Sequence, residues 1–393
     1  MRQFFIAGVL LICVFGCNER HKIVFSAKYI VDIHNPLEIS LDDFITDIDT
    51  IRLEATDESL IKDIYQIQIM DGRIYMSVNN STALFIHDLT GKYITQINDR
   101  GQGPNEYLTI TCFYLDPVNK RIVITDNLSK RILIYDKDGK QIDVIKLNFH
   151  PMFVVPYKNG YFNSCTGFKN YYNNPKMDDY HINFLDSTGV FISSALKKEN
   201  KNTVAMTSNE RINILKDGDI LYRPPLCNIV YKMHDNDIFP YYEFNNLSKF
   251  KFLSDKESRD FEYIVGEENT IKEKEERGYL LTWGTFFEAD DFVIFYFNGD
   301  DIYHLLYYDK KSSKSWFIDP LTLKGDEKSI DFFIRYVRAV SDSRIYIAPS
   351  PDYIYYELKG NIKIKDEKVQ QFLDNMDEDS NPILLSYKIK FPE

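Results

Sequence analysis

The stretch RILIYDKDGKQI, Arg131 to Ile142, carries the pattern that decides the fold. Its first run is rich in β-branched and aromatic residues, which favour a strand. That run ends at Asp136, and Gly139 precedes a second run of the same kind. Asp and Gly between two such runs are typical of a tight turn, so the stretch predicts a β-hairpin.

The same hairpin pattern recurs along the chain. The acidic residue before the turn stands at spacings of 48, 50, 49, 74 and 48 residues, in the order Asp88, Asp136, Asp186, Asp235, Asp309 and Glu357. Two further strand-like runs accompany the hairpin of the second unit. Four short strands every ~49 residues are typical of one propeller blade, which buries its faces only against neighbouring blades. The sequence therefore predicts an all-β fold, a six-bladed β-propeller over residues 46–393.

Two segments at opposite ends of the predicted propeller have no hairpin partner of their own. They are IDTIRLE, Ile48 to Glu54, and PILLSYKIKF, Pro382 to Phe391. Because unpaired edge strands promote aggregation, we expect both termini to pair and close the last blade.

Two helical insertions are expected within the β pattern. In residues 365–377, Val369, Phe372, Leu373 and Met376 repeat at helical spacing. In residues 249–278, Ser254 and Glu257 have the spacing of a helix capping box. The second insertion is either a lid or a surface brace.

The N-terminus has the features of a secretory signal. A basic Arg2 precedes an apolar run, Phe4 to Phe15, and polar residues follow Cys17. The end of the run, VFGC, resembles the lipobox of bacterial lipoproteins. The resemblance implies cleavage after Gly16, so that residues 1–16 form the signal peptide, and lipid on Cys17. An ordinary secretory signal is the alternative. Residues 17–45 are then expected to form a tether.

Composition narrows the classes of partner. A net charge of −12 disfavours nucleic acid, because an acidic chain does not neutralise a phosphate backbone. After the signal, no apolar segment reaches the ~18 residues of a membrane span, so the lipid anchor is the expected membrane attachment. The remaining cysteines, Cys112, Cys165 and Cys227, form neither a disulfide framework nor a metal pattern and are expected to be buried. No metal and no cofactor are predicted.

The loop GQGPNEY, Gly101 to Tyr107, raises the question of a phosphate site. It lacks the Lys-Ser/Thr pair of a phosphate-binding loop, and a strand rather than a helix follows it. We predict an inter-blade loop instead, in which Gly101 and Gly103 supply backbone angles closed to other residues and Tyr107 packs under the next blade.

These motifs together resemble a known family. The Gly loop, the repeated hairpins, the lipobox and the C-terminal strand with Asn381, Pro382, Tyr387 and Lys388 are similar to six-bladed β-propeller lipoproteins of Bacteroides and relatives. Their architecture is similar to that of NHL-repeat propellers. The resemblance implies a cell-envelope location, at the outer membrane, periplasmic or surface-exposed, and leaves the activity open.

Five residues at predicted blade entrances are candidates for ligand binding: Arg100, Glu106, Tyr222, Arg223 and Trp283. Arginine and aromatic side chains on loops are common binding anchors, although such residues also satisfy neighbouring backbone groups. His87, His234 and His304 fall in or beside the third strand of their units. His87 and His234 stand directly before the repeated Asp, where other units have Tyr135 and Tyr308, so we expect these two to pack in the core. No catalytic residues are assigned.

The sequence thus favours a non-enzymatic binding or scaffolding propeller on the cell envelope, with a protein, peptide or glycan held at one face. The alternative is an extracellular carbohydrate-active hydrolase or lyase, whose carboxylates would come from several blades and meet at the channel mouth. A purely structural envelope component is the third possibility.

Overall fold

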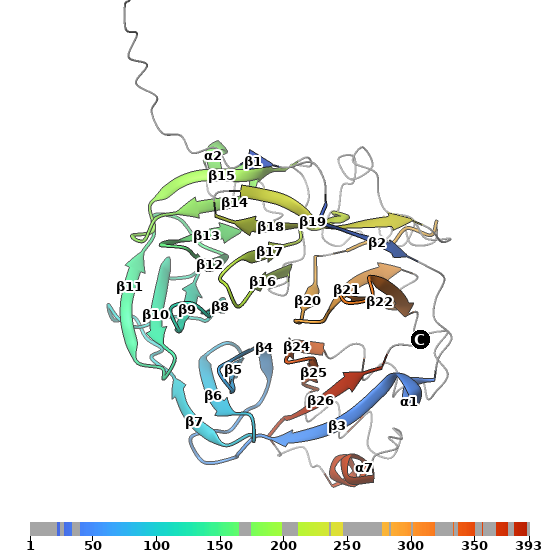
Figure 1. Cartoon of the computed structure of the whole chain (residues 1–393). Helices are drawn as coiled ribbons and strands as arrows, with labels where there is room; N and C mark the ends of the chain where they lie inside the picture. The colour runs from blue at the N-terminus through green and yellow to red at the C-terminus, as the bar shows by residue number, and fades with distance from the viewer. Residues whose placement is uncertain are drawn as a thin grey trace, which may run out of the picture.

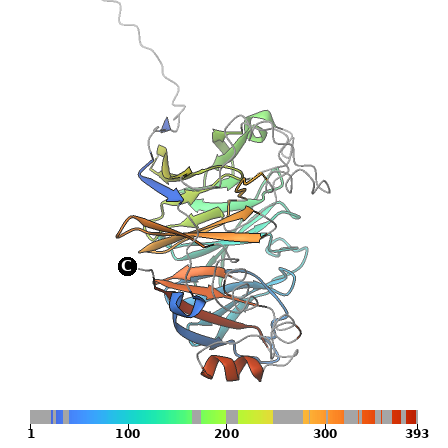
Figure 2. The ribbon, with the colours of Figure 1, turned by 90° about the vertical axis from the view of Figure 1, so that its right-hand side faces the viewer.

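A computed structural model describes residues 22–23, 27–33, 40–164, 174–198, 211–235, 237–246, 277–282, 284–299, 302–318, 333, 337–349, 356, 367–375 and 381–390. These residues form six small sheets arranged in a ring, and the predicted all-β, six-bladed propeller is confirmed (Figure 1). Figure 2 views the ring from its edge.

Blades one to three each contain four antiparallel strands in sequence order, the first strand lying innermost. Blade one consists of β4 (Ile64–Met70), β5 (Arg73–Val78), β6 (Ala83–Asp88) and β7 (Tyr93–Ile97). Blade two consists of β8 (Cys112–Asp116), β9 (Arg121–Asp126), β10 (Arg131–Asp136) and β11 (Gln141–Lys146). Blade three consists of β12 (Phe153–Tyr157), β13 (Gly160–Ser164), β14 (Tyr180–Leu185) and β15 (Phe191–Lys197).

Blades four and six recruit strands from the chain ends, whereas blade five has four consecutive strands. Blade four consists of β16 (Ile212–Ile214), β17 (Ile220–Tyr222), β18 (Ile229–His234) and β19 (Asp237–Asn246), joined by β1 (Lys22–Ile23) and β2 (Tyr29–Ile33). Blade five consists of β20 (Phe286–Glu288), β21 (Phe292–Gly299), β22 (Ile302–Asp309) and β23 (Lys314–Ile318). Blade six consists of β24 (Val337–Ser341), β25 (Arg344–Ile347), β26 (Ile383–Ile389) and β3 (Ile45–Arg52).

The Asp–Gly hairpins have one local structure in the first three blades. In blade one, Asp88 Oδ1 accepts hydrogen bonds from the backbone N–H of Thr90 (2.8 Å) and Lys92 (3.0 Å). Asp136 and Asp186 accept the equivalent bonds in blades two and three. The glycine three residues later has a φ of 82–88°, which L residues rarely adopt. Turn chemistry therefore fixes the hairpin that defined the sequence repeat.

The two chain ends close the ring, as the sequence predicts. β26 pairs antiparallel with β3 over Ile383 to Ile389 and Ile45 to Arg52. β26 fills the third place in the order β24-β25-β26-β3. The sequence repeat puts the run that ends at Glu357 in that place, and of this run only Tyr356 belongs to the described residues.

The segment 17–45 is more than the expected tether. Within it, β1 and β2 pair parallel with β19 on the outer edge of blade four. The side chains of Val31 and Ile33 are fully buried there. Burial of these two apolar residues explains why the segment adds to the sheet.

Helices are few in the described part of the chain. They are α1 (Leu41–Phe44), α2 (Pro175–Asp178) and α7 (Glu367–Asp374), the last within the segment 365–377 where a helix is expected. The insertion at 249–278 falls outside the described residues except for its last two positions. Within the described ranges, no helix has the length and apolar character needed to span a membrane.

The core lies between blades rather than within one of them. Each of six buried apolar clusters combines side chains from neighbouring blades; Tyr75 of blade one and Phe113 of blade two share one of them. The stability of each blade therefore depends on its neighbours, as expected for a repeat architecture.

Candidate functional site

A cavity of about 500 Å³ occupies one end of the central channel. Its wall is built from the innermost strands of blades one, two, four, five and six and from the turns that follow them. The lining residues used below are Gln66, Gln68, Asp71, Lys120, Asn213, Lys216, Glu288, Arg338 and Asp342.

The cavity opens at the face that carries the turn between the first two strands of each blade. Antiparallel order places the first-to-second and third-to-fourth turns on this side, which we call the turn face. The opposite side, which we call the loop face, carries the second-to-third loops and the inter-blade connections. Several turn residues have positive φ: Asp71 (51°), Lys120 (53°), Gly218 (85°) and Asp342 (48°). Charged side chains of these turns, among them Asp71, Lys120 and Asp342, lie around the mouth.

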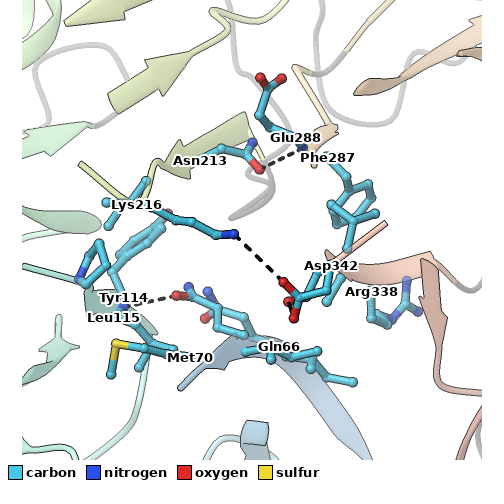
Figure 3. Close-up of a pocket in the computed structure, with 18 of the residues that line it drawn as sticks. Gln66, Met70, Tyr114, Leu115, Asn213, Lys216, Phe287, Glu288, Arg338 and Asp342 are labelled. Carbon is cyan, nitrogen blue, oxygen red and sulfur yellow. Dashed lines mark hydrogen bonds and ion pairs between the residues drawn. The ribbon is translucent and has the colours of Figure 1, made fainter. Parts of the chain in front are cut away.

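Charged residues at the mouth are paired across blades. Lys216 Nζ of blade four lies 2.6 Å from Asp290 Oδ2 of blade five and 3.8 Å from Asp342 Oδ1 of blade six. Figure 3 shows Lys216 and Asp342 directed toward one another across the cavity. Lys120 Nζ of blade two lies 2.8 Å from Asp71 Oδ1 of blade one. All these side chains are roughly half or more exposed, so water and ligands reach them.

Side-chain amides connect the inner strands deeper in the channel. Gln66 Nε2 donates to Phe113 O (2.8 Å), and Gln66 Oε1 accepts from Phe113 N–H (3.0 Å). Asn213 makes the same two-way link to Phe286 O and Glu288 N–H. Sequence reasoning missed these residues. The sequence does carry a signal for them, because Gln or Asn stands between apolar residues in the innermost strands IYQIQIM and INI.

Glu288 lines the wall with its backbone and directs its carboxylate elsewhere. Figure 3 shows the carboxylate pointing away from the Lys216–Asp342 pair. It lies 2.5 Å from Lys310 Nζ and accepts a hydrogen bond from the hydroxyl of Tyr242 of blade four (3.1 Å). Burial raises the pKa of Glu288, and Lys310 opposes that rise. The carboxylate of Glu288 therefore joins blade five to blade four through Tyr242.

The family model described as "Domain of unknown function (DUF4934)" matches residues 28–388. The chain belongs to this family. No curated protein matches the chain.

Among solved structures, the DUF4934 chain is similar to a "putative exported protein" from Bacteroides fragilis NCTC 9343. The TM-score is 0.74 and the identity 17%, over 92% of this chain and 100% of that one. It is also similar to a member of the DUF4221 family from Bacteroides vulgatus ATCC 8482, with a TM-score of 0.48 and 11% identity over 89% and 100% of the two chains. The first similarity shows a shared propeller fold.

The loop GQGPNEY of the DUF4934 chain braces blades one and two. Arg131 Nη1 of blade two donates to the carbonyls of Gly103 and Glu106, each at 2.6 Å. Tyr107 is fully buried, and its hydroxyl donates to Thr82 O (2.8 Å) and Ile97 O (3.1 Å) of blade one. The predicted inter-blade role is therefore correct, although the hydroxyl reaches back to the preceding blade.

The prediction that Gly101 and Gly103 supply backbone angles closed to other residues is wrong. Neither Gly101 nor Gly103 has positive φ. A Cβ at Gly101 would instead overlap the carboxylate of Glu106, which accepts the N–H of Gly103 (2.7 Å). Glycine at 101 therefore leaves room for this carboxylate, and an added Cβ would force the flexible end of Glu106 to shift.

The sequence-predicted ligand residues do not come together at the cavity. Arg100 is exposed on the loop face, where its Nε donates to Leu108 O (3.3 Å), and Glu106 folds onto its own loop. Tyr222 and Arg223 are fully buried, which contradicts their predicted place on an exposed rim. Trp283 and Cys17 lie outside the described residues.

Arg223 is buried because aromatic rings surround it. Its guanidinium lies 4.5–5.6 Å from the ring centres of Phe244, Phe295 and Phe297. Its Nη1 donates to the carbonyls of Thr285 (3.4 Å) and Tyr296 (3.3 Å). Burial lowers the pKa of Arg223 to about 9. The residue links blade four to blade five.

The packing prediction for the histidines is confirmed for His87 and is wrong for His234. His87 and His304 are buried, and burial lowers the pKa of His87 to about 4. His234 is more than half exposed and pairs with Asp219 at 2.8 Å, which raises its pKa. Of the cysteines, Cys112 is buried as expected, Cys227 is half-buried, and Cys165 is not among the described positions.

Proposed function

We propose that this DUF4934 protein is a lipid-anchored binding propeller of the cell envelope, which holds its partner on the turn face. The observation that carries the proposal is the cavity of about 500 Å³, whose mouth bears exposed charged side chains from blades one, two, four, five and six. Concave sites with a few convergent polar groups are the usual places for ligands.

The charge pattern favours a peptide or protein partner. Both signs are present at the mouth, with Lys120 and Lys216 beside Asp71, Asp290 and Asp342. Peptide side chains supply complementary charges of both signs, whereas a neutral glycan supplies none. Complementary charges give specificity and rapid association.

A carbohydrate-active enzyme is the second candidate, and one observation favours it. Glu288 belongs to the cavity wall and has a raised pKa, which is a property of a general acid. Its carboxylate is, however, engaged by Lys310 and Tyr242 and directed away from the channel. A glycan array run with turnover detection decides between the two, since cleavage of any glycan would establish the enzyme.

The binding proposal is tested by capture from the protein's own envelope with two matched variants. The double variant K216A/D342A changes the turn face, and R100A changes the loop face. We expect wild type and R100A to enrich the same partner and K216A/D342A to lose it. Equal capture by all three, or loss with R100A alone, would contradict a site on the turn face.

The anchor is tested separately. The motif VFGC supports lipid on Cys17, and C17A should then move the protein from the membrane fraction to the soluble fraction. Retention of C17A in the membrane fraction would disprove the lipid assignment without bearing on the turn face.

A further inference from the structure

The N-terminal segment is fixed to the outer edge of one blade. β2 extends the sheet of blade four by pairing with Tyr242 to Asn246 of β19. The hydroxyl of Ser315, in blade five, donates to the carbonyl of Asp32, and Asn245 Nδ2 donates to Asp32 Oδ1 (3.2 Å). The segment therefore runs along the outer edge of blade four, from β1 at the turn-face end of β19 to the end of β2 beside blade five (Figure 1).

The distance from this edge to the proposed lipid is short. Four residues separate Cys17 from Lys22, the first residue of β1, and β1 pairs with Asp237 and Ile238 of β19. A chain spans at most ~3.6 Å per residue, so these five steps reach about 18 Å. A lipid on Cys17 would hold the edge of blade four close to the bilayer.

The composition of this segment suits a lipid surface. Between Cys17 and Tyr29, Arg20, Lys22 and Lys28 stand against one acidic residue, Glu19, in a chain whose net charge is −12. Such basic residues favour anionic headgroups. Lys28, directly before β2, is exposed, and Ile30 on β2 has 47% of its surface exposed.

We propose that the edge of blade four at β2 rests on the membrane surface, so that the propeller stands on its rim. The channel axis then runs parallel to the membrane, and the turn face opens sideways toward neighbouring membrane proteins. This inference rests on the proposed lipid on Cys17 and not on the turn-face site.

The test compares two isoleucines on outermost strands of opposite blades. Ile30 lies on β2 of blade four, and Ile94, 40% exposed, lies on β7 of blade one. Each is replaced in turn by a fluorescent amino acid. The lipidated full-length protein is reconstituted in phosphatidylethanolamine–phosphatidylglycerol vesicles that carry a quencher on the headgroup. We expect loss of fluorescence at position 30 and little or none at position 94.

Lengthening the tether provides the matched control. Twenty Gly/Ser residues inserted between His21 and Lys22 add a root-mean-square reach of about 25 Å. Flotation with the vesicles should persist while the difference between positions 30 and 94 becomes smaller, because the long tether no longer holds the edge at the surface. Equal quenching at the two positions in the native tether would overturn the proposed orientation while leaving the anchor intact. Failure to float would overturn the anchor and the orientation together, and turn-face capture would be unaffected.

Discussion

The two faces of the propeller use polar side chains in different ways. On the loop face, Arg131 and Tyr107 satisfy backbone carbonyls of neighbouring segments, and Arg223 is buried among phenylalanines. On the turn face, Lys120 and Lys216 remain exposed around a cavity. Long loops leave backbone groups that need partners, and polar side chains supply them. Tight turns satisfy their own backbone, which leaves charged side chains available to a ligand.

The strongest test of this difference is the loop-face residue Tyr107. We expect Y107A to lower the free energy of unfolding by about 3–5 kcal/mol, as for other large buried side chains. Y107F keeps the ring and loses the two hydrogen bonds to Thr82 O and Ile97 O, for about 1–2 kcal/mol. Urea denaturation measures both. If Y107A lowered the free energy of unfolding by less than Y107F does, the buried ring would not hold the loop between the blades.

A second test concerns the ion pair of Lys310 and Glu288, behind the cavity wall. K310M would leave Glu288 buried without its cation, at a cost of about 3 kcal/mol or more at pH 7. Because the pKa of Glu288 is raised in the folded protein, the folded state binds a proton more readily than the unfolded state. Stability from this group therefore increases as pH falls toward the ordinary glutamate pKa.

The measurement is the urea midpoint of K310M and wild type at pH 7 and pH 5. We expect the destabilisation to be smaller at pH 5. K314M, the same change at an exposed position of β23, is the control and should alter the free energy of unfolding by less than about 0.5 kcal/mol. A defect in K310M that is independent of pH would exclude charge burial as its cause.

The sequence predicts what local chemistry determines. Asp136 and Gly139 define a hairpin through bonds within five residues, so the period and the number of blades follow from the sequence. The burial of Arg223 depends on Tyr296, 73 residues away, and no local pattern encodes that contact. Residue type alone suggested a ligand contact for an arginine that braces two blades.

The cavity and the edge of blade four also depend on contacts between residues far apart in the sequence, which local patterns do not encode. Gln66 meets Phe113 at a separation of 47 residues, and β2 meets β19 across more than 200. The closing strand β26 was predicted because the termini were the remaining unpaired strands. In the structure β26 is the third strand of the blade and β3 is the outermost. The sequence does not show this order, because it depends on contacts between distant segments.

A third test uses His87, which is buried on the turn side of blade one. Neither ring nitrogen has a hydrogen-bond partner among the described residues, and burial lowers the pKa to about 4. Between pH 6.5 and 4 the unfolded state binds a proton that the folded state rejects, so stability falls as pH falls. H87F removes this dependence.

Relative to wild type, the stability of H87F should improve by about 2 kcal/mol between pH 7 and pH 5. Denaturation curves at several pH values read this difference directly, and other titrating groups cancel in the comparison. A difference that stays constant with pH would mean that His87 does not titrate as a buried neutral ring. The expected improvement would show that burial, rather than closeness to the turn face, determines how His87 titrates.

The smallest expected effect on stability concerns Lys216. Its side chain is 74% exposed, and exposed ion pairs contribute little, so K216A should change the free energy of unfolding by less than about 0.5 kcal/mol. The measurement is again the urea midpoint, at low salt and at high salt. A larger decrease in the free energy of unfolding would show that Lys216 stabilises the contact between blades, as Arg131 and Tyr107 do on the loop face. The double variant K216A/D342A is measured in the same way, because Asp342 has a φ of 48°, which alanine adopts less readily than aspartate. If its urea midpoint is also close to that of wild type, a failure to capture the partner reflects the lost binding groups.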